Sequence, residues 1–239
     1  MRRIRDVVIA VVVLAVGAPV LAAISVLLRR RQGSPVLFRQ ARLGLGGQPF
    51  ELLKFRTMTD ERSTDGTLLT DVERLTPLGQ WLRSRSLDEL PELWNVVRGD
   101  MSLVGPRPLP VVYRNRFTAN EARRMDIRPG LTGWAQVNGR NSVDWDERLA
   151  MDVWYVDHRT FWMDLCILAR TVGVVLSRQG VAAEGSATMH ELRPPSRTSD
   201  GRSLTSCQMR SNQPSGGSPA GSDRPRRDGS TRCQVDRLA

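Results

Sequence analysis

Two adjacent carboxylates, Asp88 and Glu89, stand in a segment that is otherwise rich in arginine. The neighbouring cations in the sequence are Arg83, Arg85, Arg98 and Arg107. Carboxylates among arginines often form only a surface ion network. The same residue types can also form an active site that handles phosphate, because a guanidinium group binds phosphate oxygens through two parallel hydrogen bonds. The elements that carry these residues decide between the two interpretations.

The flanking residues predict that both carboxylates lie at the start of a helix. The apolar spacing over 75–87 predicts a short helix, and Pro91 stands early in the next apolar stretch. Proline is tolerated near a helix start, where free amides and a partial positive charge suit phosphate oxygens. Ser86 and Glu89 have the spacing of a capping box, which is the structural alternative for Glu89. For Asp88 the alternative is a first-turn acid worth only about 0.3–1 kcal/mol through the helix dipole.

Two other cations have a special sequence context. Lys54 is the one lysine in a chain whose lysines and arginines total 35, either because it has a function or by chance. It follows a predicted β-hairpin, in which Val36–Phe38 and Phe50–Leu53 flank a glycine-rich turn at Gly44–Gly47. Arg107 stands between two prolines, so a stiff loop would aim its guanidinium at little entropic cost. The alternative for Arg107 is a plain structural turn.

The later part of the chain predicts a loop followed by helices. The stretch 128–141 is rich in turn residues and favours a binding loop over a core element, with Thr132, Gln136, Asn138 and Arg140 as polar tips. The stretch 147–180 predicts helices. Its aromatic residues fit either a membrane interface or a soluble core: Trp154, Tyr155, Phe161 and Trp162.

The composition predicts an anionic partner and makes several other site classes improbable. A formal net charge of +10 suits nucleic acid, acidic lipid or a phosphorylated substrate. Three cysteines and two histidines without close clustering predict neither a disulfide framework nor a zinc site. A dinucleotide-binding loop at Gly44–Gly46 lacks the strand-to-helix context that such a loop requires.

The amino terminus has a strong membrane signature. No residue from Val7 to Leu28 is charged, and as a straight helix this stretch would measure about 33 Å, enough to cross a bilayer. A straight span and a cleaved signal peptide are two interpretations. Arginines at both ends and Pro19 in the middle favour a third, a proline-broken helix that enters and leaves by the same face. The straight span and the re-entrant form both remain open on these residues alone.

Taken together, the motifs resemble the bacterial sugar transferase family, also called monotopic phosphoglycosyl transferases. The resemblance covers about residues 2–184. Its motifs follow the family order: the proline-broken segment, then SPVLFRQARLG, FELLKFRTM, RSLDELPELWNVVRGDMSLVGPRP, RPGLTGWAQVNGR and MDVWYVDHRTFWMDL. The ordered set is highly specific. The chain begins close to the membrane segment, so it resembles the small, minimal form of the family.

The resemblance implies a two-step transfer. The donor would be a UDP-sugar and the acceptor a polyprenyl phosphate, undecaprenyl phosphate in most bacteria. Asp88 would attack the sugar-proximal phosphate and release UMP, leaving a phosphosugar on its carboxylate. The polyprenyl phosphate would then attack this intermediate. The product would initiate exopolysaccharide, capsule, O-antigen or glycoprotein glycan synthesis, and downstream glycosyltransferases would consume it.

The resemblance also implies roles for individual residues. Asp88 and Glu89 would be catalytic and would contact Mg²⁺, the expected cofactor. Pro19 matches the family's helix-breaking proline. The residues expected to bind substrate or phosphate, or to orient the carboxylates, are Lys54, Arg83, Arg107, Arg128, Gln136 and Asp152.

The expected fold class is α+β, with three parts. Residues 1–31 would form a re-entrant membrane helix, and residues 32–190 a helix-rich cytoplasmic domain with a small β-hairpin. Residues 191–239, rich in Ser, Gly, Pro and Arg, predict a disordered tail. The expected location is the cytoplasmic face of the bacterial inner membrane, in contact with lipid and without nucleic acid. The alternative function is a membrane-anchored basic protein that binds nucleic acid or a protein partner.

Overall fold

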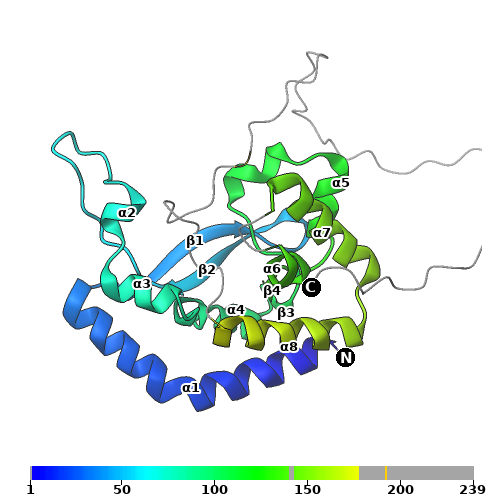
Figure 1. The fold of residues 1–239 in the computed structure, drawn as a ribbon, viewed down its shortest axis with the longest axis horizontal. Helices are drawn as coiled ribbons and strands as arrows, with labels where there is room; N and C mark the ends of the chain where they lie inside the picture. Colours follow the sequence, from blue (N-terminus) through cyan, green and yellow to red (C-terminus); the bar gives the residue numbers. More distant parts are fainter. Residues whose placement is uncertain (1, 140–142, 178–191, 193–239) are drawn as a thin grey trace, which may run out of the picture. The chain divides into compact units, whose positions relative to one another are not determined.

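The computed structural model describes residues 2–139, 143–177 and 192, so nearly all of the predicted tail lies outside the described residues. The α-helices are α1 (Arg2–Gln32), α2 (Asp71–Arg74), α3 (Pro77–Arg83), α4 (Glu92–Arg98), α5 (Ala119–Ala122), α6 (Trp134–Asn138), α7 (Trp145–His158) and α8 (Phe161–Ser177) (Figure 1). The 3-10 helices are η1 (Leu45–Gly47), η2 (Leu87–Glu89), η3 (Val111–Arg116) and η4 (Arg123–Met125). The strands are β1 (Leu37–Leu43), β2 (Pro49–Phe55), β3 (Ser102–Val104) and β4 (Gly130–Thr132).

The structure mixes helices with two small sheets, as expected for the α+β class. Strands β1 and β2 form the predicted antiparallel hairpin, with Leu37 opposite Phe55 and the glycine-rich turn at η1. The second sheet, a parallel pair of β3 and β4, was not predicted.

The segment 128–141, expected to be a binding loop, is partly regular structure. Its described residues contribute β4 and the short helix α6. The strand approaches its neighbour closely because a side chain is missing at the contact: a Cβ on Gly130 would lie 2.1 Å from the backbone nitrogen of Gly105. The many turn residues in this segment therefore serve partly for close backbone packing. Residues 140–142 lie outside the described residues.

Helix α1 is continuous through Pro19 and is bent, not interrupted (Figure 1). A proline in a helix removes one backbone hydrogen bond and favours a kink, and flanking turns can keep their helical geometry. Among the described residues, α1 alone is both long enough and apolar enough to cross a membrane.

Both ends of α1 are attached to the same folded body. At the amino end, the carboxylate of Asp6 accepts hydrogen bonds from the Ser102 hydroxyl and the Leu103 backbone nitrogen, on β3. At the carboxyl end, Leu28 is buried against Phe55. Between these ends many apolar side chains are exposed, and Val16 is 77% exposed. The middle of α1 therefore presents apolar surface that the rest of the described chain does not cover.

Candidate active site

The two carboxylates lie on η2, the short 3-10 helix immediately before α4. Pro91 occupies the position before the first residue of α4, so the predicted placement at a helix start is confirmed. The capping box, which was the structural alternative for Glu89, does not form. Ser86 has a left-handed backbone with φ of 54° and makes no side-chain capping bond. The Glu89 side chain is instead directed toward two cations.

Glu89 is the shared anion of these two cations. Lys54 Nζ lies 2.7 Å from Glu89 Oε1, and Arg107 Nη2 lies 2.6 Å from the same oxygen. Burial opposes the charge on Glu89, but Arg107 and Lys54 outweigh it and hold the pKa of this carboxyl far below its usual range. The side chains of Lys54 and Glu89 are only 17% and 20% exposed, so this cluster is not a surface ion network.

Asp88 differs from its neighbour. It is buried, with 7% of its surface exposed, and no described residue donates a hydrogen bond to its carboxylate. Burial, and then the charge of Glu89, raise the pKa of Asp88 above its usual value despite the opposing effect of Lys54, Arg83 and Arg107. Asp88 therefore has carboxylate oxygens that accept no hydrogen bond from the described part of the chain, beside several positive charges.

A third carboxylate, Glu92, belongs to the same cluster and was missed by the sequence analysis. Its Oε1 lies 3.1 Å from Lys54 Nζ, and its surface is only 2% exposed. Burial raises its pKa to about 7, with Lys54 acting against the rise and Glu89 adding to it. Glu92 follows Glu89 by three residues, a spacing that places two side chains on the same side of a helical turn. This spacing could have identified Glu92 as a member of the cluster from the sequence.

Arg42, on β1, is a second missed residue. Burial, and then the nearby charge of Arg107, lower the pKa of its guanidinium to about 10. Crowded cations of this kind are favourable only where an anion offsets their repulsion. The cluster therefore combines carboxylates with an excess of positive groups, which is the charge pattern that phosphate binding requires.

Asn95 positions Lys54 next to η2 by fixing strand β2 against helix α4. This fully buried side chain on α4 donates a hydrogen bond to the Glu51 carbonyl at 2.7 Å and accepts one from the Leu53 backbone nitrogen at 3.1 Å. Both partners are on β2, so the amide fixes the strand against α4. Lys54 is the next residue of that strand, and its ammonium lies between Glu89 and Glu92.

The other predicted site residues lie in different surroundings. Arg83 donates from Nε to the Thr57 hydroxyl at 3.0 Å, and its charge acts on Asp88. Arg128 is exposed, donates to the Gly99 carbonyl at 2.9 Å and lines a separate cavity of about 200 Å³. Gln136 lies on α6, where both polar atoms of its amide are buried without a hydrogen-bond partner among the described residues.

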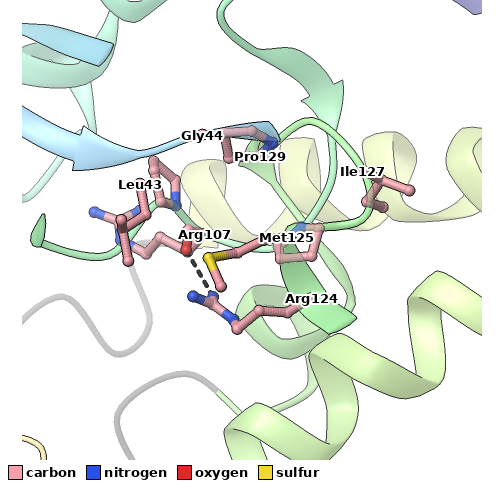
Figure 2. Close-up of a pocket in the computed structure, with 9 residues that line it drawn as sticks. Leu43, Gly44, Arg107, Arg124, Met125, Ile127 and Pro129 are labelled. Carbon is pink, nitrogen blue, oxygen red and sulfur yellow. Dashed lines mark hydrogen bonds between the residues drawn. The ribbon is translucent and has the colours of Figure 1, made fainter. Parts of the chain in front are cut away.

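Asp152 does not face open space. It is 2% exposed on α7 and forms an ion pair with Arg124 at 2.6 Å. Arg124 also donates a hydrogen bond to the backbone carbonyl of Arg107 at 2.7 Å, beside a small cavity of about 10 Å³ (Figure 2). Among the described residues, no contact joins Arg128, Gln136 or Asp152 directly to the carboxylates.

The carboxylates fit a magnesium ion that is completed by substrate. Among the described residues, no group of three or more His, Cys, Asp or Glu side chains is arranged to hold a metal by itself. Magnesium in phosphate-handling sites commonly takes only one or two protein carboxylates, together with waters and substrate phosphates. Asp88 offers such oxygens. Both cations near Glu89 contact Oε1, which leaves Oε2 without a cationic partner among the described residues.

Comparison with known proteins identifies the family of this chain. The chain matches the family described as bacterial sugar transferase over residues 1–178. It is 47% identical over 188 residues to a Bacillus subtilis (strain 168) protein named uncharacterized sugar transferase EpsL, and the match covers 79% of this chain and 93% of that protein.

Two relatives have names that state a reaction. The Caulobacter vibrioides protein is named UDP-glucose:undecaprenyl-phosphate glucose-1-phosphate transferase. It is 42% identical over 188 residues, which cover 74% of this chain and 70% of that protein. The Salmonella typhimurium protein is named undecaprenyl-phosphate galactose phosphotransferase. It is 36% identical over 198 residues, and the match covers 75% of this chain but only 41% of that longer protein. This chain is a member of the bacterial sugar transferase family.

Proposed function

We propose that this protein transfers a sugar 1-phosphate from a UDP-sugar to a polyprenyl phosphate and releases UMP. The names of the relatives from Caulobacter and Salmonella support this reaction class. The observation that carries the proposal is the contrast at η2, where Glu89 holds two cations and Asp88 forms an ion pair with none of the described cations. One carboxylate is thus available as a nucleophile while the other organises positive charge.

In the first step, an oxygen of the Asp88 carboxylate attacks the sugar-bearing phosphorus of the UDP-sugar. A new oxygen–phosphorus bond forms, the bond between this phosphorus and the bridging diphosphate oxygen breaks, and UMP leaves with that oxygen. In the second step, a phosphate oxygen of the polyprenyl phosphate attacks the same phosphorus. The bond to Asp88 breaks, the carboxylate is regenerated, and a polyprenyl-diphosphate sugar is released. Two successive displacements let a single carboxylate serve two bulky anionic substrates.

The cations near Asp88 address the main barrier, which is the repulsion between anions. Glu89 holds Lys54 and Arg107 in place before substrate binds, so their positive charges would be available to phosphate oxygens without rearrangement. Asp88 and Glu89 would hold Mg²⁺. When bound, this ion would screen phosphate charge and withdraw electron density from the phosphorus.

We propose a re-entrant membrane position for α1, on the cytoplasmic face of the inner membrane. A straight span would separate its ends by a bilayer, but Asp6 and Leu28 both contact the same body. Arginines at both ends of the apolar stretch favour the cytoplasmic side for each. The exposed aromatic residues at the start of α8, Phe161 at 52% and Trp162 at 71%, suit the headgroup region. This position brings the site to a lipid-borne acceptor, and glycosyltransferases would extend the product.

Purified full-length protein tests the function directly. UMP release is measured with Mg²⁺, undecaprenyl phosphate in mixed micelles and a panel of UDP-sugars. UMP formation that depends on both the lipid phosphate and Asp88 supports the proposal. Absence of UMP with every sugar, combined with tight binding of an anionic partner, would instead support the alternative of a basic membrane-anchored binding protein.

A further inference from the structure

The loop that carries Arg107 is held through four consecutive backbone carbonyls. The carbonyl of Pro106 accepts from the Gly130 nitrogen at 2.9 Å, and that of Leu109 accepts from the Leu43 nitrogen at 2.8 Å. The two carbonyls between them accept hydrogen bonds from arginine side chains. Arg124 Nη2 donates to the Arg107 carbonyl at 2.7 Å, and Arg42 Nη1 donates to the Pro108 carbonyl at 3.2 Å.

These hydrogen bonds to carbonyl groups anchor the loop in place of the backbone N–H donors that its prolines lack. Pro106 and Pro108 have no backbone N–H, so this part of the loop has few donors with which to join a sheet. Its acceptors are the remaining anchoring points. The prolines also fix their own φ angles, so a loop whose four carbonyls are all hydrogen-bonded has little conformational freedom. The backbone of this loop therefore sets the direction in which the Arg107 side chain leaves it. That side chain ends at Glu89, 2.6 Å away.

Arg124 has its own fixed orientation. Its Nε and Nη2 lie 3.1 and 2.6 Å from the same oxygen of Asp152. Both residues are almost fully buried, at 4% and 2% exposed. Such a two-point contact fixes the guanidinium plane, and a single ammonium could not reproduce it. Figure 2 shows the Arg124 side chain extending toward the carbonyl of Arg107.

We infer that Arg124 and Asp152 form a positioning pair for Arg107. Asp152 orients Arg124, Arg124 fixes the Arg107 backbone, and the Arg107 guanidinium is thereby directed at Glu89 and the phosphate beside it. Neither member of the pair touches reacting atoms. Asp152 thus acts through two other residues, whereas the resemblance implied that it would bind substrate or phosphate or orient the carboxylates. The effect on catalysis rests on the proposed function, whereas the effect on the loop does not.

The test combines a double-mutant cycle with hydrogen exchange, on full-length protein in micelles. Arg124→Lys and Asp152→Asn are each made alone and with Arg107→Gln. Outer contacts of this kind commonly alter activity by about 10- to 100-fold. We expect each single variant to lose roughly tenfold in kcat, and to lose less than about twofold more once Arg107 is replaced, because residues that act through one another are not additive. Conversely, Asp152→Glu, which keeps the charge, should recover part of the activity.

Hydrogen exchange supplies a readout that does not need turnover. Amides of the peptide that spans residues 103–113 should exchange faster in Arg124→Lys than in the parent protein. Asp164→Asn is the matched control, since Asp164 is an equally buried partner of an arginine, Arg5, away from the loop. This control should destabilise the protein, leave the loop exchange unchanged and combine additively with Arg107→Gln.

The inference is overturned if Arg124→Lys lowers kcat by the same factor in the parent protein and in the Arg107→Gln background. It is also overturned if Arg124→Lys leaves hydrogen exchange of the 103–113 peptide unchanged. If the parent protein itself releases no UMP, the proposed function fails, and the exchange measurement alone then decides on the positioning pair.

Discussion

Asp88 and Glu89 are adjacent in the chain, yet Glu89 accepts contacts from two cations and Asp88 accepts none from any described residue. The 3-10 turn of η2 separates the two side chains and gives each a different environment. Ion pairs hold the pKa of Glu89 very low, while burial and the charge of Glu89 raise the pKa of Asp88. In the proposed mechanism, Glu89 would hold the two cations in place and Asp88 would act as the nucleophile.

Asp88→Asn should abolish turnover, because an amide cannot form the acyl phosphate. We expect UMP release to fall by about a thousandfold or more, the scale seen when a covalent nucleophile is removed. Asp88→Asn keeps the shape of the side chain, so its melting temperature should stay near or above that of the parent. A variant that retains half of the parental UMP release would exclude Asp88 as the nucleophile.

Lys54→Met should reduce both stability and activity. The substitution leaves Glu89 with Arg107 alone and Glu92 without its cation, and breaking a buried ion pair on one side costs on the order of 3 kcal/mol. Chemical unfolding in micelles measures this change in free energy. Lys54→Met should be less destabilising in a Glu92→Gln background, since one buried charge is then absent. Equal losses in both backgrounds would show that Lys54 and Glu92 do not interact.

The stability of the protein should depend on pH through Glu92. Burial raises the pKa of Glu92 from an ordinary value of 4.5 to about 7 in the folded state. The folded protein therefore binds this proton more tightly than the unfolded chain. The resulting stabilisation is fully present below about pH 4.5 and is lost as the pH rises through 7. Glu92→Gln cannot lose a proton, so its unfolding free energy should fall less than that of the parent across this range. Parallel curves for the two proteins would argue against an unusual Glu92.

The topology of α1 can be tested with single cysteines. In a background without native cysteines, Ile4→Cys and Arg31→Cys place exposed thiols near the two ends of α1. A water-soluble maleimide should label both from the same side of inverted membrane vesicles. Val16→Cys, on the exposed apolar middle, should resist the reagent, which controls for membrane insertion. Labelling of the two ends from opposite faces would establish a straight span.

The sequence predicted the parts whose cause is local. The hairpin followed from two apolar stretches that flank a glycine-rich turn, and the position of Asp88 followed from Pro91 at a helix start. The pairing of Lys54 with Glu89 could not be predicted from local spacing, since it depends on Asn95 fixing β2 against α4. Contacts between segments distant in the chain are set by packing.

The differences between the sequence-based interpretation and the structure also arise from contacts between segments distant in the chain. The Ser86–Glu89 capping box, the structural alternative for Glu89, does not form, because two cations brought by tertiary structure bind Glu89 more strongly than a backbone amide would. The turn-rich segment that contains Gly130 looked like a loop because small residues serve both turns and close strand packing. The resemblance implied a substrate or orienting role for Asp152, and its buried ion pair with Arg124 joins segments distant in the chain, which local spacing does not reveal.

Mass spectrometry of the trapped reaction tests the central claim most directly. The protein is incubated with Mg²⁺ and a UDP-sugar but without the lipid phosphate, and is then acid-quenched and digested. We predict a phosphosugar adduct on the peptide that contains Asp88, which disappears when polyprenyl phosphate is added. Steady product formation by a protein that never shows this adduct would contradict the covalent account.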